Sequence, residues 1–165
     1  LEFLRSAGTE RRRAARRVLQ THEKRAAGSC RLLPGARDVL WALRRRELKL
    51  ALLTRNSRAS VDQVLERFDL EFDCALSRDD AEPKPSPEPV LHIADHFGVS
   101  PSELILVGDY LFDLQAAHAA GARSAILRTK RTESFLDRSD IVLEKLADLL
   151  NYLPAPPPSG PTEAP

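Results

Sequence analysis

The sequence predicts an α/β protein in which a parallel β-sheet is covered by helices on both faces. Two observations point to this class: strand-length apolar segments alternate with helix-length segments, and several of the apolar segments lack the polar alternation of a half-exposed strand. Apolar strands joined by helix-length crossovers pair in parallel and are buried on both faces. The 165 residues are enough for one domain with its own core.

The N-terminal segment, residues 1–30, predicts a basic helix over 9–27, a stretch that contains no helix breaker. Residues 1–31 carry nine Lys or Arg against three Glu, but no aromatic residue within the helix is interleaved with the arginines to stack on bases. We therefore expect a solvated helix face and no nucleic-acid partner. The residues that recur there at helical spacing are Ala15, Val18, Leu19, His22 and Ala26.

Residues 31–153 are predicted to form the α/β core. Helices are recognised by apolar residues three and four apart, and strands by short apolar runs. Gly98 and Gly121 are expected to end two of the helices. In chain order, the expected elements are helix 36–47, strand 48–53, a helix capped by Ser57 or Ser60 and running to Phe68, strand 72–76, the proline-containing loop 77–87, helix 90–97, strand 104–107, helix 112–120, strands 124–127 and 140–143, and a last amphipathic helix 146–153.

The remaining composition predicts a cytoplasmic protein without a membrane partner. No stretch approaches the roughly 20 consecutive apolar residues of a membrane-spanning helix, and the N-terminus lacks a basic-then-apolar signal pattern. Cys30 and Cys74 are too few and too far apart for a disulfide framework or a zinc site, so we expect two inert, partly buried thiols. Residues 154–165 form a proline-rich tail that we expect to be disordered.

Polar residues follow the strand predicted at 48–53. Thr54, Arg55, Asn56 and Ser57 directly precede a helix, so they offer a hydroxyl and free backbone N–H groups to an anion. Thr and Ser also commonly start helices simply as caps, which leaves a structural interpretation open for this segment alone. Ligands of parallel α/β sheets bind just past the C-terminal ends of the strands, which favours a binding role.

Lys84 lies between Pro83 and Pro85, and proline fixes the backbone on both sides of it. An ammonium carried on such a stiffened loop can neutralise phosphate or carboxylate charge, although a loop lysine is often merely solvated.

Two carboxylates, Asp109 and Asp113, lie four residues apart where the strand predicted at 104–107 meets a helix, directly after Gly108. Crowded carboxylates repel each other unless a hard cation shares them, and Mg²⁺ takes such oxygen ligands. The competing interpretation makes Asp109 a helix cap and Asp113 a first-turn acid that balances the helix dipole. For Asp109 we favour the metal.

In this order and context, Thr54, Lys84, Asp109 and Asp113 resemble the second, third and fourth sequence motifs of the haloacid dehalogenase (HAD) superfamily. The resemblance covers about residues 9–150. It implies a Rossmann-like core, Mg²⁺ as cofactor and phosphatase activity on a small phosphorylated metabolite. The surrounding residues that resemble its phosphoglycolate-phosphatase-like branch, which has a helical cap, include Leu33-Pro34-Gly35, Lys84-Pro85 and Gly121-Ala122.

The resemblance also implies a role for each residue. Thr54 would hydrogen-bond the transferring phosphoryl group, assisted by backbone N–H groups of Arg55 or Asn56. Lys84 would pair with the phosphate and the nucleophile. The metal would be bound by Asp109, while Asp113 would orient the metal's shell or Lys84 from behind. The family usually has a small hydroxyl residue where Tyr110 stands, so this position departs from the pattern.

The aspartate nucleophile of the family, followed two residues later by a second aspartate as acid and base, has no counterpart here: no two Asp separated by one residue follow an apolar run. We expect residues 1–30 to be the end of a helical cap and the first core strand to be missing, which leaves open strand edges. The chain would then be a fragment of an active enzyme, or a short product that has lost catalysis, and in either case inactive alone.

Two other functions stay open. The chain could be a non-catalytic interaction protein that uses its arginine-rich helix or proline-rich tail. A phosphoacceptor receiver domain also places carboxylates, a Thr and a Lys-Pro pair around Mg²⁺, but there the lysine follows the last strand, whereas Lys84 precedes Asp109. That order argues against a receiver domain.

Overall fold

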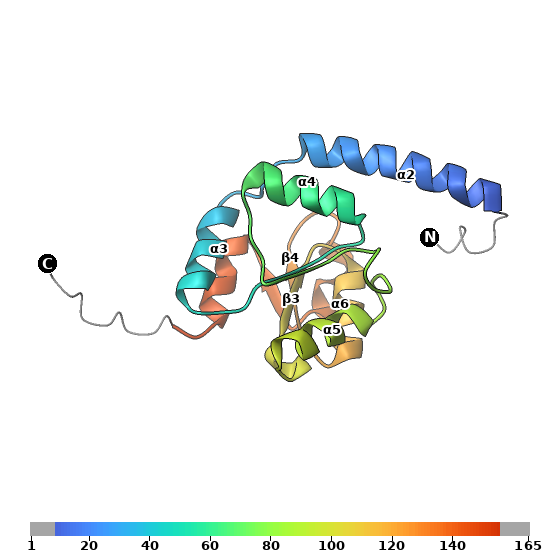
Figure 1. The fold of residues 1–165 in the computed structure, drawn as a ribbon. Coiled ribbons are helices and arrows are strands. Elements are labelled where there is room, and N and C mark those ends of the chain that lie inside the picture. The colour runs from blue at the N-terminus through green and yellow to red at the C-terminus, as the bar shows by residue number, and fades with distance from the viewer. Residues whose placement is uncertain (1–8, 156–165) are drawn as a thin grey trace, which may run out of the picture.

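The computed structural model describes residues 9–155, and their strands all pair in parallel (Figure 1). β1 (Ala51–Leu53) pairs with β2 (Cys74–Leu76), and β4 (Arg123–Leu127) lies between β3 (Ile105–Gly108) and β5 (Ile141–Leu143). The predicted α/β class is confirmed. Within the described residues, however, the strands form a two-stranded and a three-stranded sheet, with no ladder between β1 and β3.

Helices cover both faces of the three-stranded sheet, as the apolar strand sequences predict. Successive residues of a strand point to opposite faces. Accordingly, Ile105 and Val107 of β3 pack in the cluster built on α3 (Ala36–Arg45) and the terminal turn η3 (Leu146–Tyr152), while Leu104 and Leu106 pack in the cluster built on α5 (Glu88–Phe97) and α6 (Leu111–Ala120). In the centre, Ala125 of β4 is completely buried.

The N-terminal helix α2 (Thr9–Ser29) lies along α4 (Arg58–Phe68), as Figure 1 shows. Of the residues that recur at helical spacing in this helix, His22 and Ala26 are exposed, and Val18 is 58% exposed. Among the α2 side chains that the structure describes, those partly or fully buried recur four apart and are Ala15, Leu19, Glu23 and Ala27. Glu23 can lie on this partly buried face of α2 because it forms a salt bridge with Arg78, which follows β2.

Several element boundaries differ from those predicted. β1 is shorter than the run 48–53, because Leu50 is held by Asp73: its N–H donates to the Asp73 carboxylate over 2.7 Å and its carbonyl accepts the Asp73 N–H over 2.8 Å. Ser57 occupies the N-cap of α4 but its side chain makes no cap hydrogen bond; its hydroxyl lies 3.0 Å from that of Ser60.

The last predicted α-helix is instead the 3₁₀ segment η3, and two further 3₁₀ turns, η1 (Pro101–Glu103) and η2 (Glu133–Arg138), occur where no element was expected. Gly98 and Gly121 end α5 and α6 in the left-handed conformation, as predicted.

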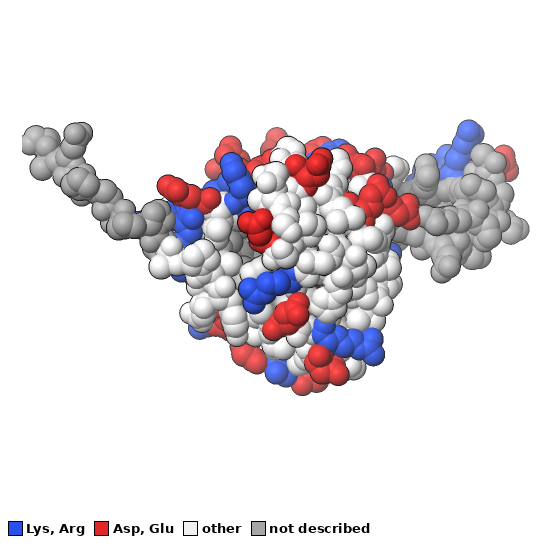
Figure 2. Space-filling model, turned by 90° about the horizontal axis from the view of Figure 1, so that it is seen from below, with Lys and Arg blue, Asp and Glu red and all other residues white. Residues whose placement is uncertain are grey.

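Among residues 9–155, none of the helices combines the length and the apolar character needed to cross a bilayer. Cys30 and Cys74 are both half-buried free thiols, as expected. Seen from below the view of Figure 1, the molecule carries acidic and basic side chains interspersed with uncharged residues (Figure 2). The tail was expected to be disordered, and its residues from 156 onward lie outside the described part of the chain.

Candidate functional site

A pocket of about 230 Å³ lies where β1 and β3 end, at the edge at which parallel α/β sheets bind ligands. Six of the residues singled out from the sequence line it, together with two aromatic residues of the segment that starts α6, whereas Ser57 is buried and does not line it. The eight lining residues are Thr54, Arg55, Asn56, Lys84, Asp109, Tyr110, Phe112 and Asp113.

The segment after β1 is fixed by backbone and hydroxyl contacts. Thr54 N–H donates to the Leu76 carbonyl over 3.0 Å, which continues the pairing of β1 with β2. The Thr54 hydroxyl accepts the Asn56 N–H over 3.2 Å. An anion that bound the Asn56 N–H would therefore replace an internal hydrogen bond, while the hydroxyl hydrogen of Thr54 remains available to donate.

Lys84 is a buried cation that connects β1 to α6. Its ammonium donates to the Leu53 carbonyl at the end of β1 over 3.0 Å and to Oδ1 of Asp113 on α6 over 2.6 Å. A buried charge is stable only when it is paired and hydrogen-bonded, and both conditions hold here. The position of the ammonium at the pocket is therefore set by β1 and α6 together.

Asp113 uses both carboxylate oxygens inside the protein. Oδ1 accepts from Lys84, and Oδ2 accepts the backbone N–H groups of Asp109 and Tyr110 over 3.1 and 3.0 Å. Gly108 makes this approach possible, because a Cβ atom at that position would collide with the Asp113 carboxyl group. Asp113 thus fixes both the lysine and the turn that carries Asp109.

Asp109 is the carboxylate of this pair that faces solvent, with 61% of its side chain exposed. Its Oδ2 lies 3.3 Å from Nη2 of Arg131, an exposed residue of the loop after β4. Within residues 9–155, no three His, Cys, Asp or Glu side chains gather as a ready-made metal cage. Mg²⁺ is commonly held by one or two carboxylates, waters and substrate phosphate, so Asp109, with Asp113 behind it, fits the metal that the resemblance implies.

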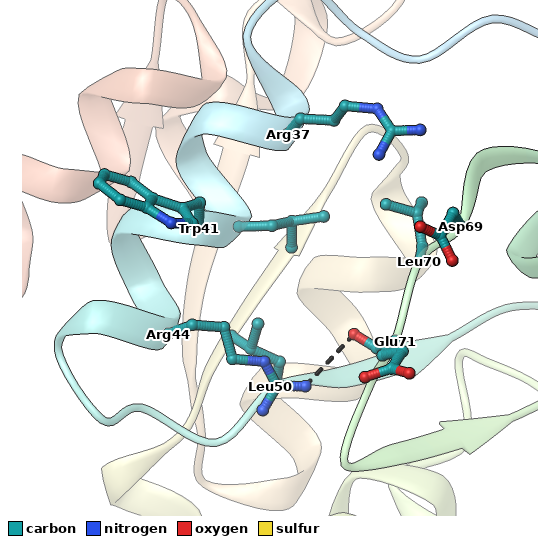
Figure 3. A pocket seen from close by; sticks show the side chains of 8 residues that line it. Arg37, Trp41, Arg44, Leu50, Asp69, Leu70 and Glu71 are labelled. Carbon is teal, nitrogen blue, oxygen red and sulfur yellow. Dashed lines mark hydrogen bonds between the residues drawn. The ribbon is translucent and has the colours of Figure 1, made fainter.

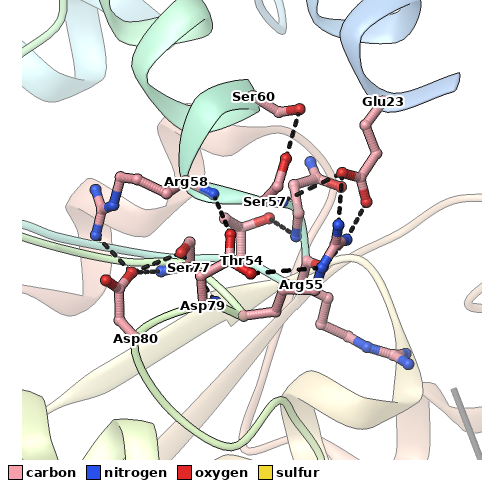
Figure 4. A network of polar contacts seen from close by, with 11 residues as sticks. Glu23, Thr54, Arg55, Ser57, Arg58, Ser60, Ser77, Asp79 and Asp80 are labelled. Atoms are coloured by element: carbon pink, nitrogen blue, oxygen red, sulfur yellow. Dashed lines mark hydrogen bonds and ion pairs between the residues drawn. The ribbon is translucent and has the colours of Figure 1, made fainter. Parts of the chain in front are cut away.

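Sequence reasoning missed an ion pair that joins α2 to this site. Glu23 and Arg78 form a salt bridge with side chains only 9% and 13% exposed. Arg78 Nη1 also donates to the Arg55 carbonyl over 3.3 Å, and Glu23 Oε2 accepts the Ser57 N–H over 3.3 Å (Figure 4). Burial alone would raise the pKa of Glu23, but the hydrogen bonds from Arg78 and Ser57 outweigh it and lower that pKa below its usual range.

Asp80, which the sequence did not single out, organises the loop before Lys84. Its Oδ2 accepts hydrogen bonds from the hydroxyl and the backbone N–H of Ser77, over 2.6 and 2.7 Å, and from the Arg58 guanidinium over 2.6 Å (Figure 4). These donors, the Ser77 hydroxyl first, hold the pKa of Asp80 below its ordinary value. No sequence pattern predicts that Asp80 contacts Ser77 and Arg58, because the pairing of β1 with β2 brings these residues together.

A larger pocket, of about 410 Å³, lies between α3 and the segment after α4 (Figure 3). Its lining includes Trp41, Arg44 and Glu71, and none of the residues predicted from the sequence to carry the chemistry. Size alone therefore does not identify the site.

Comparison with known proteins gives a consistent assignment. The family model described as haloacid dehalogenase-like hydrolase matches residues 2–127. The chain is similar to a haloacid dehalogenase-like hydrolase domain-containing protein of Arabidopsis thaliana, 30% identical over 128 residues, which are 77% of this chain and 52% of that protein. It is also similar to the phosphoglycolate phosphatase of Escherichia coli strain K12, 34% identical over 131 residues, covering 76% of this chain and 52% of that enzyme.

A solved structure of a hydrolase from Pseudomonas syringae matches with a TM-score of 0.72 and 27% identity, covering 84% of this chain and 68% of the other. The chain spans about half the length of the curated relatives it matches. Its fold, the order of its strand-end residues and these matches agree. The chain belongs to the haloacid dehalogenase-like hydrolase family, and its similarity to phosphoglycolate phosphatase agrees with the branch expected from the sequence.

Proposed function

We propose that this chain supplies the phosphate- and metal-binding side of a Mg²⁺-dependent phosphatase site that acts on a small phosphorylated metabolite. One observation carries the proposal: the Thr54 hydroxyl, the Lys84 ammonium and the Asp109 carboxylate line a single pocket at the ends of β1 and β3. A hydroxyl and an ammonium suit phosphate oxygens, and an exposed carboxylate suits a hard cation.

Each residue has a separate task in this proposal. Thr54 donates its hydroxyl hydrogen to a phosphate oxygen, and the Arg55 N–H assists. Lys84 holds its positive charge at a fixed point, because Asp113 and the Leu53 carbonyl leave it little freedom. Asp109 holds Mg²⁺, which when bound neutralises charge on the phosphate. Asp113 pairs with the lysine and keeps it aligned.

The family reaction passes through an aspartyl-phosphate, and these 165 residues contain no Asp-x-Asp pair to form it. In this proposal the side chains of the pocket bind and position phosphate and Mg²⁺, but none of them serves as the nucleophile. We therefore propose that the 165-residue chain binds phosphate with Mg²⁺ and does not turn over phosphate esters by itself.

Titration of the chain with inorganic phosphate in MgCl₂, followed by ³¹P NMR and calorimetry, tests the proposal. We expect Mg²⁺-dependent binding that weakens about tenfold or more in Lys84→Met, since a charge-assisted contact of about 1.5–3 kcal/mol is lost. Asp109→Asn should remove the Mg²⁺ dependence. The control Lys49→Met removes an exposed lysine outside the pocket, and circular dichroism checks that each variant folds.

Unchanged phosphate binding in both site variants would refute the binding role. Turnover of p-nitrophenyl phosphate that depends on Mg²⁺ and Asp109 in the isolated chain would refute the expected inactivity.

A non-catalytic interaction protein is the second candidate. The observation that favours it is Trp41, which is 62% exposed and lines the larger pocket (Figure 3). The Arg45 guanidinium carbon lies 4.9 Å from the centroid of its ring. Exposed aromatic residues with arginine are enriched at protein interfaces. Absence of phosphate binding in the titration above would favour this candidate.

A further inference from the structure

The side chain of Arg55 lies in the candidate site but has no task in the phosphate binding described above. Its guanidinium carbon lies 4.7 Å from the centroid of the Phe112 ring, which is a cation–π arrangement. Its Nε is buried and has no hydrogen-bond partner, and it is the one such atom among the side chains that the structure describes. A buried donor without a partner is costly, so such an atom calls for an explanation.

The charge of Arg55 is also uncompensated, unlike the other cations of the site. Lys84 is paired with Asp113, and Arg131 lies against Asp109. Within the described part of the chain, Arg55 forms no salt bridge with an acidic residue. A pocket that already suits one anion therefore carries a further positive charge at its wall.

The Arg55 side chain is held in place by its surroundings. The Phe112 ring below it packs edge-on against Tyr110, with ring centroids 5.0 Å apart. The backbone carbonyl of Arg55 accepts a hydrogen bond from Arg78, which Glu23 holds in turn. A guanidinium fixed by a ring and by its own backbone loses little freedom when it binds an anion, and its planar fork suits a carboxylate or a phosphate.

We propose that Arg55 binds a second anionic group of the substrate, so that the site prefers phosphate monoesters that also carry a carboxylate or a second phosphate. The inference rests on the proposed function, because it assumes that Thr54 and Lys84 hold the first phosphate. Arg55 then acts as a specificity-determining residue, and Phe112 and Tyr110 position it. The second anion offsets the uncompensated charge and gives the guanidinium a hydrogen-bond acceptor.

Three ligands that differ in one substituent test this inference on the 165-residue chain in MgCl₂. Isopropyl phosphate carries one anionic group, phospholactate replaces one methyl group by a carboxylate, and propane-1,2-diol bisphosphate carries a second phosphate. Calorimetric titration should show that at least one of the two doubly anionic ligands binds about tenfold or more tightly than isopropyl phosphate. Which of the two gains affinity distinguishes a carboxylate site from a phosphate site.

The variant Arg55→Met keeps the stacked aliphatic length and removes the charge. We expect it to abolish the preference, so that the two doubly anionic ligands bind no more tightly than isopropyl phosphate in the same variant. The matched control Arg131→Met removes the other arginine near the pocket, and the preference should persist in it. Arg55→Lys, which keeps the charge without the planar fork, should retain only part of the preference.

The outcomes separate the two proposals. If isopropyl phosphate binds and the wild-type chain shows no preference, or if Arg55→Met weakens all three ligands equally, the role of Arg55 is refuted and the phosphate site stands. If the preference is lost in Arg131→Met instead, the second anion lies at Arg131 and the inference is wrong. If none of the three ligands binds, the proposed function fails and this inference fails with it.

Discussion

Gly108 and Asp113 depend on each other at the turn from β3 into α6. The Asp113 carboxyl lies where a side chain at position 108 would begin, and from there it binds Lys84 and two backbone N–H groups. The site therefore requires a residue without a side chain at position 108. The reason is space and not backbone conformation, since Gly108 is not among the glycines with positive φ.

The substitution Gly108→Ala should therefore disrupt the site and destabilise the chain by about 1–3 kcal/mol, the usual cost of overpacking, or more if the Lys84 pair breaks. Urea unfolding measures the stability, and phosphate titration measures the site. Gly28→Ala is the matched control, because a Cβ there would meet only Gln63 Nε2 at 3.4 Å. Equal stability of the two variants would show that Asp113 moves without cost.

The site residues that the sequence could identify are those next to strand ends. Thr54 and Asp109 follow short apolar runs, and the edge at which parallel strands end is fixed by topology. The partners of Glu23 and Arg55 could not be predicted, because they depend on how α2 and α6 pack against the loop after β1. Nothing in the sequence indicates that a glutamate of a basic helix is buried. Nor does the sequence indicate which aromatic ring an arginine after a strand will contact.

At the scale of elements, α2 is joined to the core by the Glu23–Arg78 pair, which is nearly buried. Glu23→Gln keeps the shape and removes the charge, so Arg78 loses its ionic partner. We expect a loss of about 1.5–3 kcal/mol at pH 7, the range for hydrogen bonds to charged groups. Because the pKa of Glu23 is lower in the folded chain, its contribution is present above the ordinary pKa of glutamate and is lost as pH falls through the folded value.

Urea unfolding of wild type and Glu23→Gln at pH 7 and at about pH 3 measures this, with the difference expected to shrink at the lower pH, below the ordinary glutamate pKa of about 4.3. Glu66→Gln, an exposed change on α4, is the control and should stay within about 0.5 kcal/mol of wild type at both pH values. A difference that grows as pH falls would contradict the assigned direction of the pKa.

The elements themselves were largely predictable, and their ends were not. Each long segment with apolar residues three and four apart proved to be a helix except the last, where Leu146 begins a 3₁₀ segment. That segment is short, and its packing on α3 decides its geometry more than its periodicity does. The strand predicted at 48–53 is longer than β1 for a similar reason. The Leu50 N–H donates to the Asp73 side chain instead of to a neighbouring strand.

At the scale of the whole molecule, the two sheets are unequal. β4 has strand neighbours on both sides and its central residues are fully buried, whereas every residue of β1 is only half-buried and β1 pairs with β2 alone. Short two-stranded pairs are marginal without further packing. Among the contacts between the halves is the hydrogen bond from Lys84 to the Leu53 carbonyl, which Asp113 supports from α6.

We therefore predict that the amide groups of β1 and β2 exchange with solvent through a partial opening that leaves β4 closed. Native-state hydrogen exchange should show the amides of Thr54 and Cys74, which donate across the β1–β2 pair, exchanging about tenfold or more faster than those of Ala125 and Ile126, after correction for intrinsic rates. The reason is that local openings lie below the global unfolding free energy. Lys84→Met should widen the gap, since it removes the tie to Leu53, while Lys49→Met should leave it unchanged. Equal protection in both sheets would mean that the molecule opens as one unit. The contacts between the two sheets, including the hydrogen bond from Lys84 to Leu53, would then not break before global unfolding.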